Sequence, residues 1–175
     1  MRPSSANILS HASSVVILSL STGRYFCKKY FLTPFSFSAV DFPGKLTAVV
    51  FMQGCPWACP FCHNAAIRPI LKENNFSWKL FVDFLKTRVG KLDAVTFSGG
   101  EPLVQDNLSA AIEEVKALGF SIGLHTGGYR PEHLAKVLPL LDWVGMGIKA
   151  PFAAVPYKRI SGVEHLFRVL QSPDF

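Results

Sequence analysis

The chain has 175 residues, of which 49% are apolar and 17% are charged, and its formal net charge is +6 at pH 7. This length suits one domain with a sizeable core, and the sequence has no apolar run long enough for a membrane span. The positive charge is mild and no Lys/Arg block concentrates it, so we expect neither a nucleic-acid surface nor a membrane partner.

Residues 1–33 differ in composition from the rest of the chain. Positions 1–22 are rich in serine and include a short apolar patch at 15–18. A signal peptide is one interpretation, but Arg2 is the one charge before the patch and no Ala-x-Ala cleavage site follows it. We therefore expect residues 1–33 to be a poorly ordered extension or an added strand, and residues 34–175 to form the domain.

From residue 33 onward, short apolar runs alternate with amphipathic helical patterns. A lead-in over 33–44 ends at the Pro-Gly turn, 43–44. In chain order we expect strands at 46–51, 94–97, 120–124 and 143–148, and helices at about 78–89, 108–119, 131–139 and 163–170. This repetition predicts right-handed βαβ units, and hence an α/β fold with a parallel sheet and outer helices.

An unusual polar or glycine-rich sequence follows each predicted strand. These sequences are the cysteine-bearing segment 53–64, Gly99–Gly100–Glu101, His125–Thr126–Gly127–Gly128 and Ile148–Lys149. In parallel α/β proteins, ligands bind at the carboxyl edge of the sheet. We therefore expect all four segments to contribute to one site.

Three of the four cysteines, Cys55, Cys59 and Cys62, are spaced C-x3-C-x2-C directly after the first strand. Disulfides among them would need very tight loops, so ligation of a metal centre in a reducing cytoplasm is the better interpretation. Three thiolates are too few for a closed four-cysteine site. We interpret the segment as a [4Fe–4S] site with one iron open to a small-molecule ligand. Cys27 is interpreted as a small buried hydrophobe.

Other interpretations of the cysteine segment remain open. Cys59, Cys62 and His63 match the C-x-x-C-H pattern of c-type haem attachment, and the two cysteines alone could form a redox pair. Both interpretations leave Cys55 without a role. A zinc site with His63 as fourth ligand uses every cysteine, but adjacent residues 62 and 63 would have difficulty both pointing inward.

The residues after the other strands also allow two interpretations each. Gly99–Gly100 can be an ordinary turn or bare backbone that a ligand approaches. Glu101 precedes a proline, which favours an extended conformation, so it can fix the loop rather than act as an acid or base. His125 can be a packed histidine or a ligand contact, and Lys149 can be an exposed lysine or a partner for a carboxylate-bearing ligand.

Taken together, the cysteine spacing, the Ser-Gly-Gly-Glu-Pro segment at 98–102 and the Ile-Lys strand end resemble the radical S-adenosylmethionine (SAM) superfamily. Finer features resemble the anaerobic ribonucleotide reductase activating proteins, which are relatives of the glycyl-radical-enzyme activases. These features are Phe42–Pro43–Gly44–Lys45, Gly54–Cys55–Pro56–Trp57, Cys62–His63–Asn64, Phe97–Ser98–Gly99–Gly100–Glu101–Pro102–Leu103 and Leu124–His125–Thr126. The resemblance covers about residues 32–162. It implies a partial (β/α) barrel of radical SAM type, truncated at its C-terminal end because the chain stops at Phe175.

The resemblance also implies a set of site residues. Cys55, Cys59 and Cys62 would bind three irons of a [4Fe–4S] cluster, and SAM would chelate the fourth. The residues implied to contact SAM are Phe61 on the adenine, backbone near His63, Gly99 and Gly100 at the amino group, Glu101 in the same loop, and Thr126 and Lys149 near the carboxylate or an associated cation.

The implied function is that of an oxidoreductase that activates a glycyl radical enzyme in the cytoplasm. An electron from a low-potential donor such as flavodoxin or ferredoxin would cleave SAM reductively, and the resulting radical would take hydrogen from a glycine of the partner, above all anaerobic ribonucleotide reductase. The alternatives are a radical SAM enzyme acting on a small molecule or RNA, and an inactive truncated metal-binding relative. Gly147 stands where the family commonly has Asp, so we expect weakened SAM binding and a tightening effect of Gly147→Asp.

Overall fold

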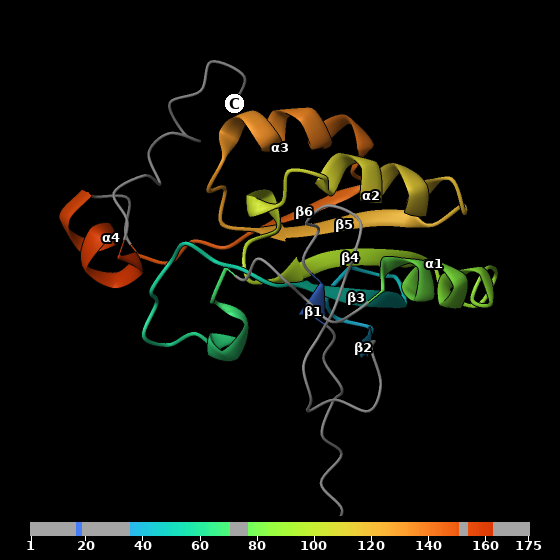
Figure 1. Cartoon of the computed structure of the whole chain (residues 1–175), viewed down its shortest axis with the longest axis horizontal. Coiled ribbons are helices and arrows are strands. Elements are labelled where there is room, and N and C mark those ends of the chain that lie inside the picture. The colour runs from blue at the N-terminus through green and yellow to red at the C-terminus, as the bar shows by residue number, and fades with distance from the viewer. Residues whose placement is uncertain (1–16, 19–35, 71–76, 151–153, 163–175) are drawn as a thin grey trace, which may run out of the picture.

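The computed structural model describes residues 17–18, 36–70, 77–150 and 154–162 (Figure 1). The strands are β1 (Ile17–Leu18), β2 (Ser36–Ser38), β3 (Thr47–Met52), β4 (Ala94–Gly99), β5 (Ser121–Thr126) and β6 (Trp143–Met146). The helices are α1 (Trp78–Lys86), α2 (Leu108–Lys116), α3 (Pro131–Val137) and α4 (Ala154–Ser161), with short 3₁₀ turns at Ala65–Ile67, Pro102–Val104 and Leu138–Leu140. None of the helices in this described part is both long and apolar enough to cross a membrane.

The described strands form one sheet in the order β1-β3-β4-β5-β6. The neighbours β3, β4, β5 and β6 pair in parallel, as the strand–helix repetition predicts. The outer edge of β3 is shared between two short strands. β1 pairs in parallel with its carboxyl end and β2 antiparallel with its amino end. The predicted α/β fold with a parallel sheet is therefore confirmed.

Helices α1, α2 and α3 pack on one face of this sheet. Alternate strand residues point toward them because side chains in a strand alternate between faces. On β3, β4 and β5 these residues are fully buried: Ala48, Val50, Met52, Val95, Phe97, Ile122 and Leu124. The apolar stripes of the helices complete the core, with Phe81, Leu85, Ile112, Val115 and Leu134 fully buried. Burial of this apolar surface is the main stabilising contribution to the sheet.

The opposite face of the sheet is more polar and is covered by the segment between β2 and β3. The Thr47 and Thr96 hydroxyls share a hydrogen bond of 2.9 Å on this face. The ring of Phe42 lies over Gly123, where a Cβ would come within 2.9 Å of it. The Lys45 ammonium donates to the Ser121 hydroxyl at 3.0 Å. Small and hydroxylated residues on the strands thus leave room for a covering loop instead of a helix.

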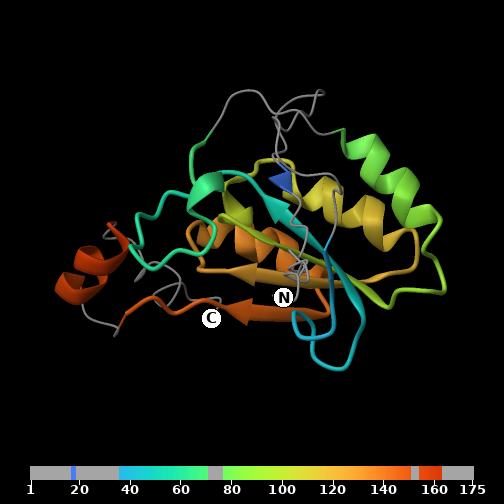
Figure 2. The same cartoon turned by 90° about the horizontal axis from the view of Figure 1, so that it is seen from below.

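The carboxyl ends of the parallel strands meet at one edge of the sheet. The loop after β3 and helix α4 both lie beyond this edge in the two views (Figures 1 and 2). The Ala58 amide donates to the Ser161 carbonyl at 2.7 Å, so the end of α4 is bonded directly to the cysteine-bearing loop.

Several element boundaries differ from the sequence expectations. Helix α1 ends at Lys86 and not near 89, and Thr87 caps it with its amide and its hydroxyl both donating to the Phe84 carbonyl, at 2.9 Å and 2.7 Å. Strand β6 ends at Met146 and not at 148. Helix α4 was not predicted, while the predicted helix at 163–170 lies outside the described residues. Within the predicted extension 1–33, the structure describes the two residues of β1 alone.

Candidate functional site

A cavity of about 420 Å³ opens at the carboxyl edge of the sheet. Its volume falls in the range of about 300–1,000 Å³ that is typical of small-molecule sites. The cavity is lined by all ten residues that the resemblance implies as cluster or SAM contacts: Cys55, Cys59, Phe61, Cys62, His63, Gly99, Gly100, Glu101, Thr126 and Lys149. The cavity wall also includes Trp57, Asn64, Ser98, His125, Gly127, Gly145 and Gly147. The four strand-end segments therefore meet at a single site, as expected.

The cysteine-bearing loop is held in place by its own backbone. The Gly54 amide donates to the Ile67 carbonyl at 2.8 Å and the Cys55 amide donates to the Arg68 carbonyl at 2.9 Å. The Cys62 amide donates to the Cys59 carbonyl at 3.2 Å, which closes the turn between the last two cysteines. Together with the bond to α4, these contacts fix where the three thiols lie without using any side chain of the loop.

Trp57 anchors the middle of this loop beneath the cavity. Its side chain is buried, and its ring lies directly against the backbone of Gly127 at the end of β5. A Cβ at Gly127 would come within 1.6 Å of the ring, so no other residue fits there without moving the indole. The sequence analysis assigned no role to Trp57. The feature of the sequence that could have indicated a close contact here is the Gly-Gly pair after the third predicted strand.

The three thiols differ in burial. Cys59 is buried, whereas Cys55 and Cys62 are partly exposed to the cavity. Burial raises the pKa of Cys55 to about 11, against a lowering effect of the hydrogen bond from the Trp57 backbone. Burial also raises the pKa of Cys59, and the nearby Lys149 ammonium opposes this rise. Metal ligation requires thiolates, so loading of this site must release protons.

The arrangement of these thiols bears on which metal centre the loop can hold. Within the described ranges, no three His, Cys, Asp or Glu side chains converge as ligands of a single ion. A tetrahedral zinc with Zn–S bonds near 2.3 Å would bring its sulfurs to within about 4 Å of one another. An iron–sulfur cluster takes each thiolate on a separate iron, so its ligands stand further apart. Cys55, Cys59 and Cys62 all line the one cavity, and a cluster that takes each thiolate on a separate iron does not need them to converge on a single ion.

Gly99 and Gly100 are required by packing inside the protein. Gly99 has a φ of +109°, and a Cβ there would lie 2.4 Å from the Met52 backbone. A Cβ at Gly100 would lie 2.3 Å from the Gly54 carbonyl oxygen. The end of β4 thus runs against the start of the cysteine loop, and the Glu101 amide donates to the Gly54 carbonyl at 2.8 Å. What these residues present to the cavity is therefore bare backbone.

Glu101 has a fully buried carboxylate that joins two of the loops. It accepts hydrogen bonds from the Thr126 hydroxyl, from the Gly127 amide at 2.8 Å and from the Leu103 amide at 3.1 Å. Burial raises the pKa of this carboxyl, while the hydrogen bonds lower it in part. The Thr126 hydroxyl also accepts from the Gly128 amide at 2.9 Å. The Glu101 carboxylate and the Thr126 hydroxyl thus both make hydrogen bonds within the loops.

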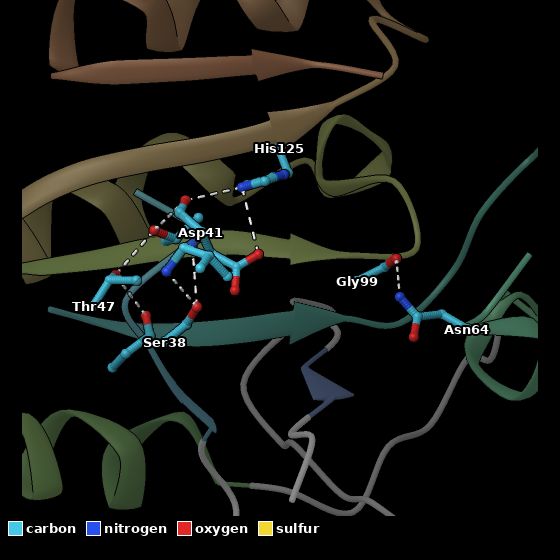
Figure 3. Close-up of polar contacts among 9 residues, drawn as sticks. Ser38, Asp41, Thr47, Asn64, Gly99 and His125 are labelled. Atoms are coloured by element: carbon cyan, nitrogen blue, oxygen red, sulfur yellow. Dashed lines mark hydrogen bonds and ion pairs between the residues drawn. The ribbon is translucent and has the colours of Figure 1, made fainter. Parts of the chain in front are cut away.

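His125 and Asn64 tie further segments to the cavity wall (Figure 3). The His125 Nε2 lies 3.0 Å from the Asp41 carbonyl oxygen and 3.8 Å from its carboxylate Oδ1. The His125 ring also packs edge-on against Trp143, with the ring centroids 5.0 Å apart. The Asn64 side-chain amide donates to the Gly99 carbonyl at 3.2 Å. His125 is therefore a packed residue that also lines the cavity, and Asn64 links the cysteine loop to β4.

The remaining predicted residues face the open side of the cavity. Phe61 is 54% exposed, so its ring has a free surface at the mouth, and His63 beside it is also exposed. The Lys149 ammonium lies 5.7 Å from the centre of the Trp57 ring. These three side chains are available to a ligand, in contrast to Glu101 and Thr126.

Comparison with known proteins gives the wider context of this site. A protein of Methanocaldococcus jannaschii, provisionally named a glycyl-radical enzyme activating enzyme, is 33% identical over 120 residues, which is 66% of this chain and 48% of that protein. The pyruvate formate-lyase-activating enzyme of Clostridium pasteurianum is 34% identical, over 65% of this chain and 50% of that enzyme. A Thermococcus kodakarensis protein named a probable GTP 3',8-cyclase is 31% identical, over 68% of this chain and 39% of that protein.

The chain spans about half the length of the first two relatives. A solved structure, that of Streptococcus suis SuiB, aligns with a TM-score of 0.46 and 16% identity over 66% of this chain and 27% of that chain, which is too low to carry an argument.

The family comparison covers most of the chain. Residues 49–171 match the Radical SAM superfamily, a range that includes the cysteine loop and every residue assigned to the cavity. Members of that superfamily use a [4Fe–4S] cluster and SAM, which agrees with three cysteine thiols and bare glycine backbone around one cavity. The chain therefore belongs to the radical SAM superfamily.

Proposed function

We propose that this protein is a radical SAM activase that cleaves SAM reductively and installs a glycyl radical on a partner enzyme, specifically an anaerobic ribonucleotide reductase. The observation that carries the proposal is that three cysteines of one loop and three other strand ends line the same cavity. The similarity to proteins named as glycyl-radical enzyme and pyruvate formate-lyase activating enzymes supports the choice of reaction.

In this proposal Cys55, Cys59 and Cys62 hold the cluster as thiolates, and the fixed backbone of their loop sets its position. Phe61 covers the adenine with its exposed ring, while backbone near His63 binds the adenine edge. The cluster and SAM, when bound, supply the one-electron cleavage chemistry. A general base is not required from the chain, so its contribution is to bind, orient and shield the reactants.

The remaining residues divide into ligand contacts and loop supports. The Gly99 and Gly100 backbone and the Lys149 ammonium face the amino-acid end of SAM. Glu101 and Thr126 act from behind, since their hydrogen bonds hold the β4 and β5 loops together. Trp57 packs on the bare Gly127 backbone and excludes water from the floor of the cavity. We therefore propose that Glu101 and Thr126 position the loops, and not that they contact SAM directly as the resemblance implies.

Anaerobic reconstitution with iron and sulfide tests the first half of the proposal. We expect about four irons and four sulfides per chain, and release of 5′-deoxyadenosine when SAM and a strong reductant are added. Zinc without iron, or a loaded cluster that releases no 5′-deoxyadenosine, would contradict the proposal. A loaded cluster without release of 5′-deoxyadenosine would indicate an inactive metal-binding relative.

The partner is tested by co-incubation under the same conditions. We expect a glycine-centred electron paramagnetic resonance signal on an anaerobic ribonucleotide reductase, with reduced flavodoxin or ferredoxin as electron donor. A pyruvate formate-lyase is the matched comparison. A signal on pyruvate formate-lyase alone would mean that the partner enzyme is a different one, while the activase function would still stand. We also propose that the protein acts in the cytoplasm, because the open iron of such a cluster is sensitive to oxygen.

A second candidate is a radical SAM enzyme that modifies a small molecule, and the similarity to the probable GTP 3',8-cyclase favours it. The discriminating observation is substrate-dependent consumption of SAM. If GTP stimulates formation of 5′-deoxyadenosine and no glycyl radical enzyme does, the small-molecule function replaces the activase.

A further inference from the structure

We propose that Asn64 is a positioning residue whose side-chain amide holds the Gly99 carbonyl against the end of the cysteine loop, and thereby sets the backbone acceptor that the amino-acid end of a ligand meets. The proposed function gives Asn64 no part in binding. The identity of the ligand, SAM, rests on that proposed function.

The side chain of Asn64 is not used by the turn that it begins. Asn64 is the N-cap residue of the 3₁₀ turn Ala65–Ile67, where an asparagine side chain commonly accepts a hydrogen bond from an amide of the first turn. Here the backbone carbonyl of Asn64 accepts from the Ile67 amide at 3.0 Å, and the side chain makes no capping bond. The side-chain amide donates instead to the Gly99 carbonyl at 3.2 Å, 35 positions away in the chain (Figure 3). It therefore links two segments that are distant in sequence.

The Gly99 carbonyl lies where the sheet no longer holds it on one side. The pairing of β4 with β3 runs to Gly99, but its pairing with β5 ends at Phe97 and Leu124. Gly99 also has no side chain, and the Met52 backbone leaves no room for one. A carbonyl oxygen has two lone pairs, so the bond from Asn64 leaves Gly99 able to accept a second bond, from a ligand ammonium. Both residues line the cavity, which puts this acceptor within reach of a ligand.

The link also connects the ligand side of the cavity to the cysteines. Asn64 comes two residues after Cys62, so it belongs to the end of the cysteine loop. The start of the same loop is bonded to the β4 end by the Glu101 amide, which donates to the Gly54 carbonyl at 2.8 Å. The β4 end is thus held by both ends of the cysteine loop, by backbone at one and by the Asn64 side chain at the other. The position of the Gly99 carbonyl therefore depends on the position of the cysteines.

Binding of two ligands to the cluster-loaded full chain tests this role. S-adenosylhomocysteine carries the amino-acid end of SAM, whereas 5′-methylthioadenosine lacks it. We expect Asn64→Ala to raise the Kd of S-adenosylhomocysteine about tenfold, the size of effect typical of hydrogen bonds to charged groups. The Kd of 5′-methylthioadenosine should not change, because this ligand has no group that meets the Gly99 carbonyl.

Asn107→Ala is the matched control for this substitution. Asn107 is the N-cap residue of α2, its side chain likewise makes no capping bond, and it is exposed. Its replacement should leave both dissociation constants unchanged. Two results with Asn64→Ala would overturn the proposal. An equal rise for both ligands would mean that Asn64 supports the loop in general, and no rise for either would mean that the carbonyl does not depend on it.

Amide hydrogen exchange of the full chain without cluster or ligand gives a second readout. The Gly100 and Glu101 amides each donate at 2.8 Å to a backbone carbonyl of β3 or of the cysteine loop. We expect both amides to exchange several times faster in Asn64→Ala, because the β4 end opens more readily without the link. Asn64→Asp keeps the shape of the side chain but cannot donate to a carbonyl, so it should raise the same two rates. The amide of Val95, in the middle of β4, should exchange at the wild-type rate in both variants.

The exchange rates also separate this inference from the proposed function. Wild-type rates in Asn64→Asp would show that the shape of the side chain, and not its hydrogen bond, holds Gly99, which would contradict the inference. If the wild type binds neither ligand while both Asn64 variants exchange faster, the proposed function fails and the positioning of Gly99 by Asn64 stands.

Discussion

The two faces of the sheet are built on different principles. The face under α1, α2 and α3 carries alternating apolar residues that are fully buried, such as Val50, Phe97 and Leu124. The other face carries Thr96, its β5 partner Gly123, and His125, and a loop covers it. The first face needs only apolar bulk, whereas the second depends on individual hydrogen bonds and on the absence of side chains.

This difference explains why the cavity lies where it does. A loop held by a few polar contacts leaves open space above the second face, and Ser98, His125 and Gly145 of that face line the cavity. The helix-covered face is filled to its carboxyl edge. Substitutions on the two sides should therefore affect different properties, namely stability on one side and ligand chemistry on the other.

The largest expected effect is on the chemistry. Replacing Cys59 by alanine removes one of the three proposed cluster ligands, so we expect formation of 5′-deoxyadenosine to fall below detection after anaerobic reconstitution. The free energy of unfolding of the metal-free chain should change by only about 1 kcal/mol. Cys27→Ala, outside the C-x3-C-x2-C segment, is the matched control and should retain activity. Retained SAM cleavage by Cys59→Ala would defeat the assignment.

The next effect compares two phenylalanines, one on each side. Phe97→Ala should lower the free energy of unfolding by about 3–5 kcal/mol, because it leaves a cavity in the core. Phe61→Ala, at the exposed mouth, should cost under about 1 kcal/mol but should weaken SAM binding. Urea unfolding and ligand titration measure the two quantities. Equal losses of unfolding free energy in the two variants would mean that Phe61 at the cavity mouth contributes as much to the core as Phe97 does.

A smaller effect is expected from the pH dependence of stability. The folded-state pKa of Glu101 is raised by burial above its unfolded value. Its contribution to stability is therefore present below the usual carboxyl pKa and is lost as pH rises through the folded pKa. Glu101→Gln cannot titrate, so its unfolding free energy should fall less than that of the wild type between pH 4 and 8. The exposed Glu113→Gln is the control, and its curve should run parallel to the wild type.

The smallest effect is expected at the covering loop. Asp41→Asn should change the free energy of unfolding by less than about 1 kcal/mol, because His125 bonds the backbone carbonyl at 3.0 Å and the carboxylate is 3.8 Å away. His125→Ala should cost about 1–2 kcal/mol, since it removes that bond and the packing on Trp143. A larger effect from Asp41 than from His125 would show that the ion pair, not the backbone bond, holds the loop.

Much of the architecture and the membership of the site could be predicted from local patterns. The apolar runs that became β3, β4, β5 and β6 alternate with helical stripes, and that alternation predicts a parallel sheet. The carboxyl edge collects strand ends, so the residues after those strands, from Cys55 to Lys149, had to meet. Helix α4 escaped prediction because its place depends on contacts distant in sequence, the buried Tyr157 and the Ser161 carbonyl bonded to Ala58.

The sequence by itself determined which residue types surround the cavity, because strand order and ligand chemistry depend on local patterns and residue identity. Only the tertiary structure decided what each of them does there. Glu101 and Thr126 prove to hydrogen-bond neighbouring loops, and Gly127 makes room for Trp57. These roles are set by atoms that approach within a few ångströms across distant segments, and no local pattern in the chain records such distances.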